Sequence, residues 1–349
     1  MRAIATVKDL EAVVGRRLLP SLLKSITELD GHCRAFAELS PLGFLSFVDA
    51  DGRDRAAAVG GPPGFASITS ATTVELALPD GLGAPHAVSG AALLLLIPGV
   101  RETLRINGRL TAKEDGKAVL DVEEAFLHCA KCVIRSQLWT PAASEAPAPA
   151  PAPSSGDGPL AGREVLGLLA RSPFAVIASR DASGTADLSP KGDPPGFIRV
   201  LDDRTIAIPD RPGNQRTDTF HNIVERPDVT VLAIVPGESR ALEMSGTATV
   251  TDDPDLLASM QVKGKQPHAA LLVRVARADL LHQEALTASD PWNPARPPAD
   301  LDRLDLRRAW VDHVKQNKQS GLAAALVRKA ANASLTDAGL RLDYKRNLY

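Results

Sequence analysis

The sequence predicts a mainly β protein of the α+β class, in which two copies of one small antiparallel barrel are followed by a C-terminal helical extension. Three observations predict this arrangement. A Pro- and Ala-rich segment divides the chain, and the parts on either side share landmarks at constant spacing. Short β-branched segments bounded by Gly, Pro or Asp recur in both parts, a pattern typical of small antiparallel barrels.

Composition and charge set the broad class of the protein. The chain has 349 residues, 44% hydrophobic and 23% charged, enough for two or three domains with cores. The net charge of -2 provides no overall attraction to nucleic acid or acidic membranes. The longest purely apolar run, 91–97, is far shorter than the ~20 residues of a membrane-spanning helix, and residues 1–8 lack a signal-peptide pattern. We expect a cytoplasmic protein with no nucleic-acid or membrane partner.

The cysteines do not indicate a disulfide framework or a metal site. Cys33, Cys129 and Cys132 are an odd and sparse set. Cys129 and Cys132 have C-x-x-C spacing, but only His128 lies close by as a further zinc ligand. We therefore expect no bound metal, and we interpret the pair as two small side chains in a packed segment.

The Pro- and Ala-rich segment, residues 141–159, favours extended polyproline II conformation and cannot form a core. At ~3.1 Å per residue it could span roughly 60 Å, ample for the flanking parts to fold back on one another. The expected organisation is therefore a first domain at 1–140, a linker at 141–159, a second domain at 160–290 and a helical extension at 291–349. Helical periodicity at 304–314 and 322–333 predicts the helices of the extension.

The two domains carry matching landmarks. At an offset of 132 residues, SP, DADG and GPPGF of the first copy match SP, DASG and DPPGF of the second; at an offset of 138, IPG and NG match VPG and SG. Collinear matches at such constant spacing predict a duplication.

The second copy is longer by eight residues between 209 and 236 than the first is between 79 and 98. The extra piece corresponds to 214–224, which reads as a short helix with Asn214 as its N-cap.

Several of these segments resemble the pyridoxamine 5'-phosphate oxidase-like family of FMN-binding split barrels. In the second copy they are 187–197, 208–218 and 222–223, and in the first copy 97–108, 122–131 and 135–139. The resemblance covers nearly everything from residue 1 to about 286. It leaves the linker and the helical extension unexplained.

In that family two subunits bind each FMN in a groove at their interface, so the resemblance implies a dimer fused into one chain. The second copy has SPKGDPP where the first has AVGGPP, and the first has ETLRING where the second has RALEMSG. Only one of the two grooves is then expected to be complete. The chain is expected to be a monomer or to form a further homodimer.

The resemblance implies a set of cofactor-binding residues: Ser189, Lys191, Arg211, Asn214 and Arg216 from the second copy, and Arg135 and Trp139 from the first. A phosphate needs cations, hydroxyls and backbone N–H groups, which Lys191, Arg216, Ser189 and the helix near Asn214 supply. The alternative is that Lys191 and Arg216 are solvated charges paired with Asp193 and Asp218. Arg211 reaches either the phosphate or nothing.

Arg216 is expected on a surface turn, where its removal would affect folding little. Arg135 and Trp139 are expected to cap the flavin ring, since a guanidinium and an indole both stack on planar systems; the alternative is that Trp139 packs the end of its domain. His128 and Lys131 are candidates to face the substrate, or else ordinary core or interface residues. No catalytic side chain is assigned.

The function expected is that of an FMN-dependent oxidoreductase acting on a small molecule, with the flavin performing the redox step. One alternative is a non-catalytic barrel, or one that binds haem or deazaflavin. Another is an interaction module whose basic C-terminal helices recruit a partner, although those charges are more simply a solvated helix face.

Overall fold

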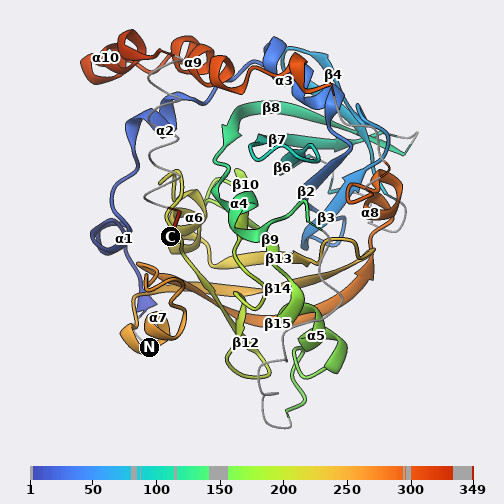
Figure 1. The fold of residues 1–349 in the computed structure, drawn as a ribbon, viewed down its shortest axis with the longest axis vertical. Coiled ribbons are helices and arrows are strands. Elements are labelled where there is room, and N and C mark those ends of the chain that lie inside the picture. Colours follow the sequence, from blue (N-terminus) through green and yellow to red (C-terminus); the bar gives the residue numbers. More distant parts are fainter. Residues whose placement is uncertain are drawn as a thin grey trace.

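The computed structural model describes residues 3–79, 85–86, 88–113, 116–140, 156–293, 295, 300–332 and 348–349. Their strands form two antiparallel sheets flanked by helices (Figure 1). The prediction of two barrel domains in tandem with a C-terminal helical extension is confirmed. The expected linker at 141–159 lies outside the described residues up to position 155. No helix of the described ranges has the length and apolar content needed to cross a bilayer.

The two sheets have the same strand order. The first runs β3 (Asp54–Gly60), β2 (Leu42–Val48), β6 (Ser89–Leu96), β7 (Thr103–Ala112), β8 (Lys117–His128), β5 (Thr73–Ala77), β4 (Ala66–Ser70). The second runs β10 (Ala186–Gly192), β9 (Phe174–Arg180), β13 (Asp228–Ile234), β14 (Arg240–Thr251), β15 (Ala270–His282), β12 (Thr205–Pro209), β11 (Arg199–Val200). Each strand of one sheet therefore has a counterpart at the same place in the other, as a duplication requires.

Helices occupy the connections and the ends. In chain order they are α1 (Val7–Val14), α2 (Leu19–Leu23), α3 (Gly31–Leu39), α4 (Lys131–Ser136), α5 (Arg163–Arg171), α6 (Asp218–Glu225), α7 (Pro254–Ser259), α8 (Glu284–Ser289), η1 (Leu301–Arg303), α9 (Leu306–Gln316) and α10 (Leu322–Ala330). The last two lie close to the helices predicted at 304–314 and 322–333.

The matching landmarks have steric and hydrogen-bonding causes. The register slips at the same place in both copies, between Asn107 and Gly108 and between Ser245 and Gly246. A Cβ atom at Gly108 would lie 1.9 Å from the carbonyl oxygen of Asp121, and one at Gly246 would lie 2.0 Å from that of Arg274. Because no side chain fits at such distances, the bulge requires glycine in both domains.

The serine of each Ser-Pro landmark also repeats its role. The Ser40 hydroxyl donates to the carbonyl oxygen of Leu96 on β6 at 2.7 Å, and the Ser172 hydroxyl donates to that of Ile234 on β13 at 2.8 Å. The landmark therefore marks the point where each domain's first long strand is tied to its neighbour.

The first residues of the chain complete the second sheet. Strand β1 (Ala3–Ile4) pairs with β14, and Leu10 of α1 is buried in the core of the second domain. Thr6 caps α1, since its hydroxyl accepts a hydrogen bond from the backbone N–H of Asp9 at 3.1 Å. Residues 3–14 therefore pack with the second domain, although they precede the first copy in the sequence.

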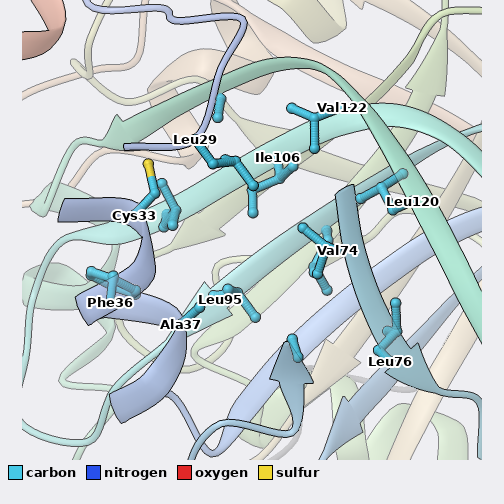
Figure 2. Packing of buried hydrophobic residues seen from close by; sticks show 14 of the residues in the cluster. Leu29, Cys33, Phe36, Ala37, Val74, Leu76, Leu95, Ile106, Leu120 and Val122 are labelled. Carbon is cyan, nitrogen blue, oxygen red and sulfur yellow. The ribbon is translucent and has the colours of Figure 1, made fainter. Parts of the chain in front are cut away.

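The apolar run 91–97 is buried on both faces. Leu93 and Leu95 point into the first barrel's core, which α3 covers (Figure 2), whereas Leu94 and Leu96 point into a cluster shared by the two domains. Successive side chains of a strand alternate between faces, so a strand between two cores must be apolar throughout. The rings of Phe44 and Phe174 meet in the shared cluster with centroids 6.0 Å apart, and the domains form one continuous apolar interface.

The C-terminal helices pack on the first domain and on α2, as Figure 1 shows. Ala309 of α9 enters the first core, and Val314 packs with Leu23 of α2 and Ala324 of α10. Several of the basic residues of this extension form ion pairs, including Arg303 with Glu38. These pairs agree with a solvated, paired helix face rather than a free basic surface.

We predict that Gly108→Ala destabilises the protein by at least about 2 kcal/mol, because the new methyl group overlaps a backbone carbonyl that cannot move without breaking the sheet. Urea denaturation measures the change. Gly167→Ala is the control: Gly167 lies within α5 with no atom within 4 Å of a new Cβ, so alanine should stabilise the protein by roughly 0.5–1 kcal/mol. A Gly108→Ala variant as stable as the wild type would contradict the steric explanation.

Candidate cofactor and substrate site

A cavity lies where the two domains meet. Its inner part, about 130 Å³, is lined by β10, the 209–217 loop and α6 of the second domain and by β7, β8 and α4 of the first. An outer part of about 570 Å³, which we call the chamber, shares several of these walls and extends to α2 and α9. The chamber has the size of an ordinary ligand pocket, and the inner part can hold a small group such as a phosphate.

Eight of the nine predicted site residues line the inner cavity. They are Ser189, Lys191, Arg211, Asn214 and Arg216 from the second domain and His128, Lys131 and Arg135 from the first. The structure therefore brings together residues from both copies that are up to 88 positions apart in the sequence, between His128 and Arg216.

Trp139 does not line this cavity. Its indole N–H donates to the carbonyl oxygen of Val100 at 2.6 Å, and its ring packs against the apolar cluster between the domains. This packing does not support the expectation that Trp139 caps a flavin ring. Its place matches the alternative, packing at the end of the first domain.

Arg135 holds the cavity wall together. Its guanidinium donates to the carbonyl oxygens of Gly192, Pro212 and Leu348 at 3.0, 3.0 and 2.8 Å. It is buried, and these bonds join α4 of the first domain to β10 and to the 209–217 loop of the second. Arg135 thus positions the loop; its donors are directed at backbone carbonyls rather than at the face of a ring.

The helix in the 209–217 region begins later than predicted. α6 starts at Asp218, after Gln215 and Thr217, which have φ angles of 52° and 54°. These two left-handed residues delay the helix by one turn, so Asn214 is not its N-cap. The Asn214 side-chain oxygen Oδ1 instead accepts from the backbone N–H of Arg216 at 3.1 Å, and its Nδ2 is buried without a hydrogen-bond partner among the described residues.

Lys191 and Arg211 are each held by a carboxylate at the cavity wall. The Lys191 ammonium lies 3.1 Å from Asp210 and over the ring of Phe220, rather than beside Asp193 as the alternative expectation had it. Arg211 pairs with Asp193 at 2.7 Å and donates to the carbonyl oxygen of Met260. Both cations are therefore fixed in place before any ligand binds.

Arg216 is not on the surface. Only 6% of it is exposed, and its guanidinium lies 2.7 Å from Asp218 and 2.8 Å from Glu124 of the first domain. It also donates to the Ser25 hydroxyl at 2.7 Å. The expectation that Arg216 lies on a surface turn is wrong, because the loop that carries it is folded inward against β8. We therefore expect its removal to affect folding.

Arg105 is the functional candidate that the sequence analysis did not identify. It is 1% exposed, it pairs with Asp187 and Asp218 of the second domain, and its guanidinium stacks on the Phe126 ring 4.3 Å from the centroid. The signal in the sequence is the contrast between ETLRING and RALEMSG, which places Arg105 of one copy against Glu243 of the other.

A second ion pair lies at the equivalent place on the other side of the domain interface. Glu243 reaches into the first domain to Arg55 at 3.1 Å, and Arg55 is the counterpart of Asp187 at the offset of 132 residues. Two interdomain ion pairs thus occupy equivalent places with their charges exchanged. In both pairs the cation belongs to the first domain and the carboxylate to the second.

Charge and burial determine the ionisation of the cavity's side chains. Burial would raise the pKa of Asp218, but Arg105 and Arg216 outweigh it and hold this pKa well below its usual range. Burial lowers the pKa of His128 well below its usual value, and the nearby Arg105 and Lys24 lower it further. His128 is therefore a neutral imidazole at pH 7, able to donate and to accept a hydrogen bond.

These residues fit a phosphate group. Asn214 and Arg105 line the inner cavity, and Asn214 Nδ2 and Arg105 Nε are buried without hydrogen-bond partners in the part of the chain that the structure describes. Unsatisfied buried donors are costly and are usually matched by a ligand or water. Together with the Lys191 ammonium, these donors suit an anion that accepts several hydrogen bonds. The Ser189 hydroxyl, by contrast, already donates to Asp187 at 2.9 Å and accepts from Arg105 at 3.2 Å.

Comparison with known proteins agrees with the resemblance seen in the sequence. Residues 161–282 match the family described as pyridoxamine 5'-phosphate oxidase. No curated relative matches the chain.

Similar solved structures each cover about one third of the chain. HupZ of Group A Streptococcus is 20% identical over 35% of this chain and 94% of its own, with a TM-score of 0.30. A putative pyridoxamine 5'-phosphate oxidase of Lactobacillus delbrueckii is 22% identical over 34% and 92%, with a TM-score of 0.27. A related FMN-binding protein of Nostoc punctiforme is 13% identical over 34% and 82%, with a TM-score of 0.28.

We predict that Arg105→Met lowers the free energy of unfolding by about 3–5 kcal/mol, because it leaves the carboxylate of Asp187 buried without its cation. Adding Asp187→Asn should restore part of the loss. Arg109→Met is the control in the same strand: Arg109 is half-exposed in a pair with Glu123, worth less than about 1 kcal/mol. Equal stabilities of the two single variants in denaturant titrations would contradict the role given to Arg105.

Proposed function

We propose that this chain, whose second domain is a pyridoxamine 5'-phosphate oxidase-like split barrel, is an FMN-dependent oxidoreductase with one flavin site between its two domains. One observation carries the proposal. Residues selected from the two copies separately, because each copy retains a different half of a binding motif, converge on a single cavity with cations and unsatisfied donors.

The inner cavity suits the phosphate of FMN. Lys191 and Arg216 supply positive charge, and the Asn214 side-chain amide supplies a donor, all from the second domain. The ion pairs with Asp210, Asp218 and Glu124 hold the two cations in place, so little ordering remains to be done on binding.

The chamber next to it suits the ring and a substrate. Bound FMN would supply hydride or electron transfer, and the protein's own part is to position the reactants and to exclude water. Neutral His128 and buried Lys131 lie on the wall that the two parts share, where they can orient a polar group of the substrate.

We predict that the purified protein is yellow and binds about one FMN per chain, with the absorption bands of flavin. FAD should bind much more weakly, because a cavity of about 130 Å³ that closes around a terminal phosphate leaves no path for an adenylate group. Absorption spectroscopy and titration measure both. A Soret band in place of the flavin bands would indicate haem, and two tight FMN sites per chain would contradict the single-site proposal.

We predict that Lys191→Met weakens FMN binding roughly ten- to a hundredfold, the usual effect of losing one charge-assisted contact. Fluorescence quenching of FMN measures the affinity. Arg216→Ala should weaken binding similarly and, because Arg216 is buried in ion pairs, should also lower the melting temperature of the flavin-free protein.

His86→Ala is the control, because His86 is exposed in the first copy's counterpart of the phosphate loop. It should leave FMN affinity unchanged. If His86→Ala weakens binding as much as Lys191→Met, the flavin lies in the other half of the molecule.

A further inference from the structure

One part of the wall of the chamber beside the inner cavity is built by segments outside the two barrels. Leu18 and Ser21 come from the α2 region, and Leu306, Arg307 and Trp310 come from α9. These helices pack on one another through Leu23 and Val314. This part of the chamber wall is therefore supplied by the added helices, whereas the barrels supply the rest.

Lys24 ends α2 and lines this chamber. Only 5% of it is exposed, yet its ammonium has no hydrogen bond or ion pair with any described residue. The Lys24 Nζ atom lies over the face of Phe126, 5.5 Å from the ring centroid. A lysine whose side chain is this nearly buried usually has a counter-charge.

The neighbouring ion pairs explain why no carboxylate pairs with Lys24. Arg105 and Arg216 stack on the same Phe126 ring, at 4.3 and 3.9 Å. These two guanidiniums take the three nearby carboxylates, Asp187, Asp218 and Glu124. The third cation of the cluster is left with its donors available to whatever enters the chamber.

Lys24 keeps its charge at neutral pH. Burial lowers its pKa to about 8; Arg216 and Arg105 repel the proton further, while Cys129 and Asp218 oppose them. At pH 7 most molecules therefore carry an ammonium at this position.

The rest of the chamber is apolar with a positive bias. Leu18, Leu127, Leu306 and Trp310 form its apolar surface. Its other ionisable groups are Lys131, Arg307, Glu102, Cys129, His128 and His268, of which Glu102 is the carboxylic acid. Burial raises the pKa of Glu102 above its usual value.

We propose that the chamber binds an organic monoanion, an apolar body with one carboxylate, and that Lys24 pairs with that carboxylate. A single unpartnered ammonium matches one negative charge, and the leucines and Trp310 match the apolar body. The inference rests on the proposed function in one respect: such a molecule would be the substrate that lies against the flavin.

The test uses naphthalene-2-carboxylate and its neutral analogue naphthalene-2-carboxamide, with binding to the full chain measured by calorimetry at pH 7. We expect the carboxylate to bind at least about tenfold more tightly than the amide, and Lys24→Met to abolish the difference by weakening the carboxylate alone roughly ten- to a hundredfold. Lys8→Met, at an exposed position of α1, should change nothing. Trp310→Ala should weaken both probes alike.

Equal affinity of the wild type for the two probes would overturn the inference, whether or not Lys24→Met folds. A preference for the carboxylate that survives Lys24→Met would also overturn it. The calorimetry is done with FMN-loaded and flavin-free protein, and FMN affinity is measured separately. Loss of FMN binding with the carboxylate preference intact would therefore refute only the flavin proposal, and the reverse result only the inference about Lys24.

Discussion

The Arg105 guanidinium extends from β7 of the first domain to Asp187 and Asp218 of the second, and almost none of it is exposed. Ions buried in this way are tolerated only when every partner is in place, so the contact permits one arrangement of the two domains. Asp218 also holds Arg216, which in turn reaches Glu124 of the first domain. The inner cavity, the phosphate-binding candidates and the position of the 209–217 loop all depend on this chain of charges.

The two domains share one scaffold, and the charged residues between them differ. The strand order, the bulge and the serine ties are the same in both domains, because backbone geometry demands the same residues at each. The charged positions between the domains are under no such demand, and Arg105 and Asp187 have Glu243 and Arg55 as counterparts. In a fused pair each copy can keep a different set of cavity residues, whereas two identical subunits must carry the same set.

The helices outside the repeat add a second level of asymmetry. α2 and α9 pack against each other and close the side of the chamber, and they bring Lys24 and Trp310 to a wall that neither barrel provides. The repeated fold accounts for how a cofactor would be held. The added helices account for which molecules could reach it, since their side chains face the open volume.

The sequence by itself determined the duplication, the class of fold, the C-terminal helices and most of the residues around the cavity. It could do so because turns, glycine-requiring bulges and strand alternation are local, and each leaves its own mark in the order of residues. The tertiary structure alone decided that Arg216 is buried, that Trp139 packs away from the cavity, and that Arg105 and Lys24 belong to the site. Those outcomes depend on which surfaces of two domains meet, and Arg105 and Asp218 are 113 residues apart in a sequence that carries no local record of their contact.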